Sequence, residues 1–388
     1  MPYRGNWISY SVLCYMSVTI KEVTDKKQLK AFIDLPYRLY RDNPYFVPAL
    51  RFDEEATLRK DKNPAFDYCE ARYWLAYKDG RAAGRIAAII NHAYIQKWNN
   101  PYIRFGWIDF EEDEEIVRLL VSEVENWARE NGLRAVHGPL GFTDLDHEGM
   151  LIEGFDQLGT LATIYNYPYY PALLERNGYV KDTDWVEFKI KVPNPIPEKL
   201  DKIASIVQRR LDLTVVRAKS AKQILPYDHA IFDLINDSYS DLYGVVPLTE
   251  KQIRYYTKQY FSFIKPDFVS LIVDRSGKLA AFGITMPSLS VALQKAKGSL
   301  FPFGFLHILK AMRKNSVGDL YLVAVRKDLQ GKGANALLMH EVNKSYIRNG
   351  IEYAESNPEL EDNTQVQALW EHFEAVQHKR RRCFIKHL

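Results

Sequence analysis

A short loop between an apolar segment and a helical pattern carries the residue types that bind phosphate groups. The apolar segment ends at Val325, and the loop passes through Gln330, Gly331, Lys332 and Gly333 directly into the helical pattern. Backbone amides at the start of a helix have no acceptor inside the helix, and the helix dipole adds positive charge there. Glycines let the backbone approach a ligand closely, because no side chain intervenes. The loop is therefore predicted to bind an anion such as a pyrophosphate.

This loop resembles the pyrophosphate loop of the GNAT superfamily, whose members are acyl-CoA-dependent N-acyltransferases. The family pattern is Arg/Gln-x-x-Gly-x-Gly/Ala, and its amides hold the pyrophosphate of coenzyme A. Gln330 and Gly333 match this pattern, whereas Asn335 stands where Gly or Ala is usual. The resemblance implies acyl-CoA as co-substrate, held by Leu322, Val323, Val325, Gln330, Gly331, Lys332, Gly333, Ala334, Asn335 and Asn363.

A later segment resembles a second family pattern, Asn-x-x-Ala-x-x-Leu-Tyr-x-x-x-Gly-Phe. Asn363, Val366, Leu369 and Trp370 fall at matching positions. In many members the Tyr is the general acid that protonates the departing thiolate. Trp370 replaces it here, and an indole N–H does not give up its proton at working pH. Either another group or water supplies the proton, or the domain does not catalyse. Core packing is the alternative role for Trp370.

Acyl transfer to an amine also needs a base near the thioester carbon. In the GNAT family a Glu or Asp near the fourth or fifth strand often serves, while a fourth-strand amide polarises the thioester carbonyl. The apolar segment 320–325 holds no carboxylate. The nearest choices are Glu355 and Glu361, which we predict as catalytic residues. The alternative for each is a solvated surface carboxylate.

Three prolines within residues 193–197 favour an extended chain and divide the sequence into two halves. The expected division is an N-terminal extension over 1–15, a first domain over 16–192, a linker over 193–199 and a second domain over 200–388. Both halves read with the same order of strands and helices, so each is predicted to be a mixed-sheet α/β domain. The chain resembles bacterial tandem GNAT proteins, which implies two GNAT-like domains with largely antiparallel central sheets flanked by helices.

Four of the predicted elements surround the chemistry. Helical periodicity predicts helices over 112–131, 330–349 and 364–374, and a last short strand is expected near 382–385.

In the first half, the residues before the 112–131 helix differ from the phosphate-binding loop. The stretch 110–115 carries five carboxylates and no glycine. Carboxylates complement the helix dipole themselves and repel a pyrophosphate, so the first half is predicted not to bind coenzyme A.

Two polar or aromatic stretches of the first half have open roles. Residues 143–148 include Thr143, Asp144, Asp146, His147 and Glu148 at spacings that match no zinc or calcium loop, and no metal is predicted. They are interpreted as an acceptor-contacting loop or plain surface. The tyrosine-rich run 165–171 lines an acceptor pocket or packs in the core.

Two segments of the second half also have alternative roles. The apolar segment 300–309, followed by cations, covers an acyl channel, touches a membrane surface or lies between the domains, and we expect the last of these. The basic run 379–382 is expected to be solvated charge near an edge strand, with contact to an anion or RNA as the alternative.

Composition limits the class of protein. A chain of 388 residues with 47% hydrophobic and 26% charged residues is globular. The net charge of +3 gives no support for nucleic acid as a main partner, so DNA binding is not expected. The three cysteines are far apart, which favours a reducing compartment, and no apolar stretch reaches the length of a membrane span. A cytoplasmic location without stable membrane insertion is expected.

The predicted function is therefore acyl transfer, with acetyl as the expected group, from acyl-CoA to a small-molecule amine or peptide. The protein is expected to be a monomer or homodimer. A non-catalytic acyl-CoA-binding or scaffold protein is one alternative. The other is an aminoacyl-tRNA-dependent transferase, which needs a broad basic surface that this net charge does not indicate.

Overall fold

The computed structural model describes residues 18–260 and 264–388, so the predicted extension over 1–15 lies outside the described residues. The first half contains β1 (Thr19–Glu22), α1 (Lys26–Leu39), α2 (Arg51–Leu58), β2 (Cys69–Lys78), β3 (Arg81–Asn91), α3 (His92–Trp98), β4 (Tyr102–Phe110), α4 (Glu114–Glu130), β5 (Ala135–Gly138), β6 (Met150–Glu153), α5 (Tyr169–Arg176) and β7 (Val180–Lys191).

The second half repeats much of this order. It contains α6 (Glu198–Arg210), β8 (Leu213–Val216), α7 (Ala221–Ile224), α8 (Asp228–Ser238), α9 (Glu250–Tyr260), β9 (Val269–Asp274), β10 (Leu279–Pro287), α10 (Ser290–Ala296), α11 (Gly304–Arg313), β11 (Val317–Val325), α12 (Ala334–Arg348), β12 (Tyr353–Ser356), β13 (Glu359–Leu360), α13 (Thr364–Gln367) and β14 (Ala375–His387). Among the described residues, every helix is too short or too polar to cross a bilayer.

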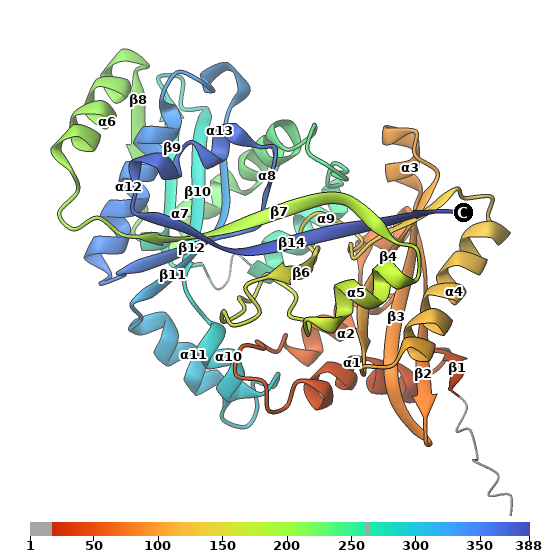
Figure 1. Cartoon of the computed structure of the whole chain (residues 1–388). Helices are drawn as coiled ribbons and strands as arrows, with labels where there is room; N and C mark the ends of the chain where they lie inside the picture. Colours follow the sequence, from red (N-terminus) through yellow and green to blue (C-terminus); the bar gives the residue numbers. More distant parts are fainter. Residues whose placement is uncertain (1–17, 261–263) are drawn as a thin grey trace, which may run out of the picture.

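Each half packs helices on both faces of its part of the sheet (Figure 1). Successive side chains of a strand point to opposite faces, and β3 follows this rule. Ile86 and Ala88 share a buried cluster with Leu120 of α4. Between them, Ala87 belongs to a separate cluster with Phe32 of α1. In the second half α12 and α6 cover one face and α8 covers the other. The predicted fold class, mixed sheets flanked by helices, is confirmed.

The last strand of each half pairs with the other half. β7 pairs antiparallel with β12 of the second half, and β14 pairs antiparallel with β5 of the first half. The two strands also pair with each other along most of their length, side by side across the middle of Figure 1. The described strands thus form one sheet of 14 strands. The predicted domain limits stay a prediction, but neither half completes its sheet with its own last strand.

Predictions for the helices that precede the exchange hold, whereas those for the last two elements need correction. α4 and α12 confirm the helices expected over 112–131 and 330–349. The helix expected over 364–374 ends at Gln367 and is followed by a 3-10 turn over Trp370–His372. β14 is 13 residues long rather than a short strand near 382–385. Pairing on both sides stabilises this long strand, although its charged sequence has low strand propensity.

The strand exchange also buries charges that were expected at the surface. The expectation of solvated charge over 379–382 is wrong for Lys379 and Arg381, which are each 1% exposed because β14 lies inside the sheet. Lys379 Nζ lies 3.4 Å from a carboxylate oxygen of buried Glu187 and 2.8 Å from one of Glu355. Arg381 donates to Glu187 as well. Burial alone would raise the pKa of Glu187, but Arg381 and Lys379 hold it below the ordinary value.

A Glu187→Gln substitution should destabilise the fold, because it leaves two buried cations without their shared anion. We expect the free energy of unfolding, measured with denaturant at neutral pH, to fall by about 3–5 kcal/mol. The matched control is Glu198→Gln, which removes an exposed ion pair with Lys202 on α6 and should cost less than about 1 kcal/mol. Equal losses of unfolding free energy for the two variants would contradict the larger contribution expected from Glu187 and its buried cations.

Candidate functional site

The parallel pairing of β11 with β12 covers only the first part of β11. Their pairing runs from Val317↔Tyr353 to Leu320↔Ser356 and ends there. Beyond it the chain of the second strand continues as β13, which pairs with β7 instead of β11. On its other side, β11 has a bulge at Tyr321, where its register against β10 shifts. β11 therefore has no strand partner on the β12 side over residues 321–325, and we call this side the free edge.

Backbone groups of two predicted cofactor residues point to the free edge. The Arg326 amide donates to the Ala280 carbonyl of β10. In an antiparallel pair, hydrogen-bonded and non-bonded positions alternate along each strand. The backbone N–H and C=O groups of Val323 and Val325 therefore point away from β10. Their carbonyls accept from side chains instead, that of Val323 from the Tyr239 hydroxyl at 2.8 Å. Their amides lie on the same side and are available to a ligand that runs along the strand.

The phosphate-loop prediction falls on a turn with free amides. Gly331 and Gly333 both have positive φ, 69° and 90°, in the left-handed region that favours glycine. Among the described residues, no hydrogen bond uses the amide of Gly331, Gly333, Ala334 or Asn335. A Cβ on Gly331 would meet nothing within 4 Å. Gly331 and Lys332 of this turn are exposed, Gly333 and Asn335 are half-buried, and Ala334 is buried. The turn lies beside the start of α12, where an anion cradle is expected.

The remaining predicted cofactor residues have structural contacts of their own. Gln330 Nε2 donates to the Val325 carbonyl at 3.0 Å, and the Lys332 carbonyl accepts from Arg210 of α6 at 2.6 Å. Asn335 Oδ1 accepts from the backbone amide of the following residue, Ala336, at 3.0 Å. Asn363 is the N-cap of α13, and Leu322 packs beside the core under α8. None of these contacts tests a cofactor role, which stays a prediction.

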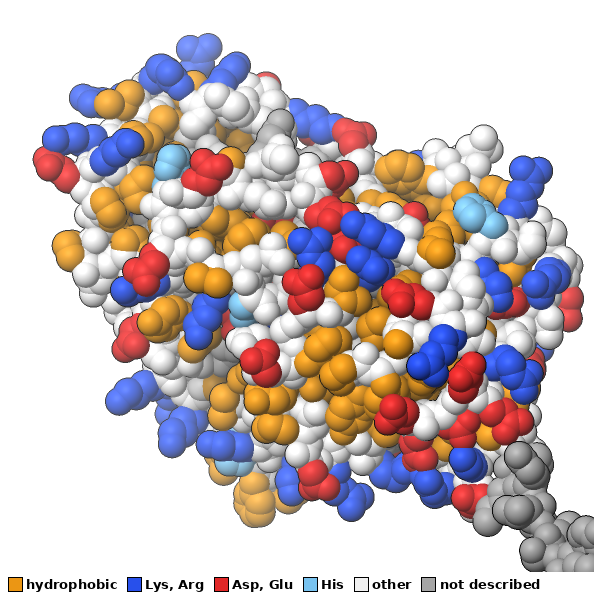
Figure 2. Space-filling model, in the orientation of Figure 1, with side chains coloured by type: hydrophobic (Ala, Val, Ile, Leu, Met, Phe, Trp, Pro, Cys, Tyr) orange, Lys and Arg blue, Asp and Glu red, His pale blue; other side chains and the backbone are white. Residues whose placement is uncertain are grey.

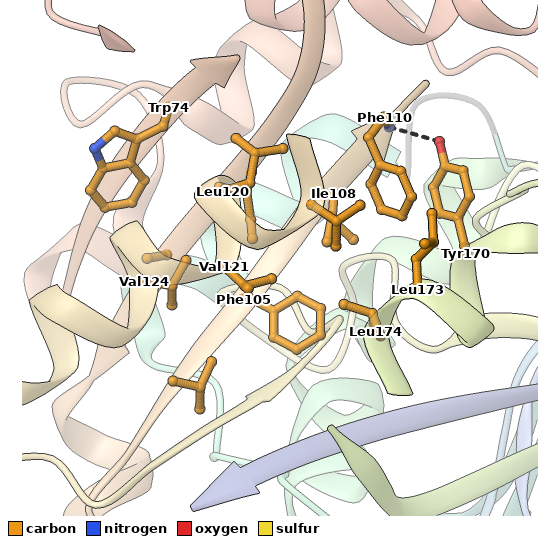
Figure 3. Packing of buried hydrophobic residues seen from close by; sticks show 14 of the residues in the cluster. Trp74, Phe105, Ile108, Phe110, Leu120, Val121, Val124, Tyr170, Leu173 and Leu174 are labelled. Atoms are coloured by element: carbon orange, nitrogen blue, oxygen red, sulfur yellow. Dashed lines mark hydrogen bonds between the residues drawn. The ribbon is translucent and has the colours of Figure 1, made fainter. Parts of the chain in front are cut away.

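The first half uses its own side chains where the second half has free backbone groups. At the start of α4, Asp113 Oδ1 accepts from the amides of Glu115 and Ile116 at 2.9 and 3.4 Å. At the end of β4, Phe110 donates its amide to the Tyr170 hydroxyl at 2.9 Å and its ring stacks on Tyr170 (Figure 3). The tyrosine-rich run 165–171 thus packs in the core of the first half.

A carboxylate that the sequence did not single out lies just beyond β12. Both oxygens of Glu359 accept from Nε1 of Trp370, at 3.0 and 3.1 Å. Burial raises the pKa of Glu359 to about 7, although the bond from Trp370 opposes the shift. Trp370 itself is 6% exposed and packs in the core, as the alternative reading of its role expected. A carboxyl group with a pKa near neutral is suited to exchange protons with a substrate.

The two carboxylates predicted as catalytic are bound by cations. Glu355 lies 2.8 Å from Lys379 in the buried charge group. Glu361 lies 2.5 Å from Lys181 and 2.8 Å from Arg380. Their catalytic roles stay predictions. Glu359 is better suited than either, because no cation of the described chain pairs with it.

Tyr239, at the end of α8, links the free edge with the first half. Burial and then the charges of Asp144 and Glu359 raise the pKa of Tyr239, so its phenol stays protonated while it donates to Val323. Asp144 lies in the loop 143–148 of the first half, and burial raises its pKa to about 6. Sequence analysis missed Tyr239, since 84 residues separate it from Val323. Groups of both halves therefore act electrostatically on one tyrosine.

One group of possible metal ligands lies elsewhere, where the last strands are exchanged. Ligand atoms of His137, Asp182 and Cys383 lie within 4.8 Å of one another. The Tyr243 hydroxyl joins them, donating to Asp182 at 2.5 Å and lying 3.1 Å from His137 Nδ1. Burial raises the pKa of the Cys383 thiol and lowers that of His137, so both are neutral at physiological pH. Hydrogen bonds through the Tyr243 hydroxyl join these three side chains, while His137 Nε2 is buried without a partner among the described residues. The prediction of no metal stays a prediction.

Comparison with solved structures identifies the architecture. A tandem GNAT protein from the clavulanic acid biosynthesis pathway matches with a TM-score of 0.55 over 96% of this chain and 98% of its own, at 12% sequence identity. The chain has the tandem GNAT fold.

Two curated bacterial proteins are related in sequence over most of the chain. Protein YghO of Escherichia coli is 27% identical over 394 aligned residues, which cover 99% of this chain and 97% of YghO. A protein of Caulobacter vibrioides named bacterial ceramide synthase is 28% identical over 321 residues, which cover 81% and 82% of the two chains. No protein-family model matches the sequence.

The raised pKa of Glu359 predicts a pH dependence of stability. A carboxyl group whose pKa rises on folding stabilises the fold below its ordinary pKa, and this contribution is lost as the pH rises through the folded value. For Glu359 the loss should occur between about 4.5 and 7. Glu359→Gln keeps the acceptor for Trp370 without the charge. The melting temperature of wild type should therefore fall relative to that of Glu359→Gln over this range. For the control Glu371→Gln, at an exposed position, the difference in melting temperature from wild type should not change with pH. The same result for Glu359→Gln would contradict the raised pKa of Glu359.

Proposed function

We propose that the protein is an acyl-CoA-dependent N-acyltransferase whose second half binds the cofactor. The observation that carries the proposal is the combination of the free edge of β11 with the unbonded amides of Gly331, Gly333, Ala334 and Asn335. The amides of Val323 and Val325 would bind the pantetheine arm, and the glycine turn with exposed Lys332 would bind the pyrophosphate. Acyl-CoA would supply the activated thioester.

Two groups beside the free edge are proposed to move protons. Glu359 would accept the proton of the attacking amine, directly or through water, as the nitrogen–carbon bond forms. The Tyr239 hydroxyl would protonate the thiolate as the carbon–sulfur bond breaks, in place of the tyrosine that Trp370 replaces. The proposal for Tyr239 is supported by its bond to Val323 and by the raised pKa that keeps it protonated. The amine substrate would enter beside Asp144 of the first half.

The name of one relative suggests which amines to test. A ceramide is a long-chain amino alcohol with a fatty acyl group on nitrogen, and the Caulobacter relative is named for its synthesis. We therefore propose long-chain amines as acceptors and long-chain acyl groups as donors, alongside the acetyl transfer expected from the sequence. An aminoacyl-tRNA-dependent transferase would bind charged tRNA on a filter, and a non-catalytic acyl-CoA-binding protein would release no free coenzyme A with any amine.

Coenzyme A binding should depend on the glycine turn. Gly331→Val with Gly333→Val strains two positive-φ positions, and a Cβ at residue 333 would meet Val207 at 2.9 Å. By calorimetry we expect the dissociation constant for coenzyme A to rise at least about tenfold. The matched control is Gly277→Val, which strains the positive φ of the β9–β10 turn and should leave binding unchanged. Glu112→Ala with Glu114→Ala in the first half should also leave it unchanged. Undiminished binding by the Gly331 and Gly333 variant would refute the proposed site.

Turnover should depend on Glu359 more than on the two carboxylates predicted from the sequence. We expect Glu359→Gln to lower kcat by about 10²-fold or more, with little change in coenzyme A affinity, because it removes a proton acceptor. The rate of wild type should rise as the pH passes about 7. Glu361→Gln is the comparison. Release of free thiol during reaction with an amine panel measures each rate. A large loss for Glu361→Gln with none for Glu359→Gln would favour the sequence-based assignment.

A further inference from the structure

The segment inserted between β10 and β11 exposes an unusual amount of apolar surface. Over residues 18–260 and 264–388, 13 large hydrophobic side chains are exposed, and six of them lie in residues 291–309. Phe301 and Phe303, in the turn before α11, are 79% and 69% exposed. Along α11, Leu306 and Leu309 are 51% and 49% exposed. Single exposed hydrophobic residues are normal, whereas a group of this kind marks an interaction surface. We call residues 291–309 with the cations that follow them the insert face.

The opposite side of the insert is firmly attached to the first half. Ile308 and Met312 of α11 pack in a cluster with Leu289 and Val47. Gln294 of α10 donates to the carbonyls of residues 44 and 46 at 2.7 and 3.0 Å. The sequence-based expectation of burial between the domains is therefore met by one side of the insert only. The aromatic turn and the outer side of α11 remain at the surface.

The charge of the insert face has a single sign. Between Asp274 and Asp319 the sequence holds seven Lys and Arg residues and no Asp or Glu. Exposed cations of the insert are Lys295, Lys297, Lys310, Arg313 and Lys314. None of these five forms an ion pair with a described residue, so their charges are not neutralised by neighbouring carboxylates. At the lower edge of the molecule in Figure 2, below α10 and α11 in Figure 1, blue side chains surround an apolar projection.

We propose that the insert face docks on an anionic phospholipid membrane surface. An interfacial anchor needs aromatic and leucine side chains that enter the headgroup boundary and cations that contact anionic headgroups. The insert face provides both on one rigid element, with Phe301 and Phe303 at its tip. A protein partner or a second copy of the chain would have to supply an acidic surface. No acidic group of the described residues pairs with a cation of the insert. An anionic lipid surface carries negative charge over its whole area, so it can contact these cations in whatever arrangement they have.

The position of the insert relative to β11 indicates how membrane docking would serve the reaction, and this step rests on the proposed function. α11 ends at Arg313, close before β11 begins at Val317, whereas the glycine turn follows the far end of β11 after Val325. A nine-residue strand separates the two ends by about 30 Å. With the pyrophosphate at one end of β11, the acyl group would point toward the insert. A long-chain amine in the membrane could then reach the reaction centre without crossing water.

Vesicle sedimentation with the full chain tests the docking. We expect the protein to sediment with phosphatidylcholine vesicles that contain phosphatidylglycerol and to stay in solution with phosphatidylcholine alone. Phe301→Ser with Phe303→Ser should lower binding at least about tenfold, since it removes two exposed apolar groups. Lys310→Gln should lower it about fivefold, and adding Arg313→Gln should lower it further by a similar factor.

Matched control variants are available on α6, another exposed helix. Ile206→Ser removes an apolar side chain that is 54% exposed, and Lys199→Gln removes an exposed cation. Both should sediment as wild type does. No sedimentation with anionic vesicles, or an equal loss for the α6 variants, would overturn the docking. So would a homodimer that the Phe301 and Phe303 variant converts to a monomer, because the insert face would then be a contact between two copies.

Coenzyme A binding in solution separates this inference from the proposed function. The insert variants should bind coenzyme A as wild type does, because the glycine turn is at the other end of β11. Membrane binding that persists in the Gly331 and Gly333 variant supports the docking, even if the cofactor assignment fails. Loss of membrane binding in that variant would overturn the docking as an independent property of the insert face.

Discussion

The pairing of β7 with β14 is the constraint on which the rest of the molecule depends. Each strand ends one half of the sequence and completes the sheet of the other, so the halves cannot fold as separate closed units. The exchange places charged residues of both strands inside the sheet. It is compatible with a stable core only because Lys379 and Arg381 meet Glu187 there. The same arrangement draws β13 toward β7 and leaves β11 without a partner beyond Leu320.

The two halves show how one order of elements can serve different purposes. In the first half, Asp113 satisfies the amides at the start of α4, and Tyr170 satisfies the end of β4. In the second half, the corresponding amides belong to Gly331 and Gly333 or follow them, and no described side chain accepts a hydrogen bond from them. A helix N-terminus that carries its own carboxylate has no need of an anion, whereas one without it attracts an anion. This difference explains why a cofactor role is assigned to the second half alone.

The first half contributes to the site in spite of this. Its loop 143–148 brings Asp144 close enough to influence Tyr239, which itself contacts the free edge. Its segment at residues 44–51 holds the insert in place through Gln294 and Arg51. In the proposed reaction the first half would therefore position the acceptor side, and the insert connects the first half with a surface that is apolar and basic.

The sequence by itself determined the local features of this protein. The glycines of the turn, the helical periodicity of α4 and α12, the carboxylates before α4 and the apolar insert all depend on neighbours within a few residues, and local propensity decides them. The tertiary structure alone decided which strands pair. It buried Lys379 and Arg381, gave Glu359 its neutral-range pKa and brought Tyr239 to β11. These properties depend on burial and on contacts between residues far apart in the chain, and no local pattern encodes either.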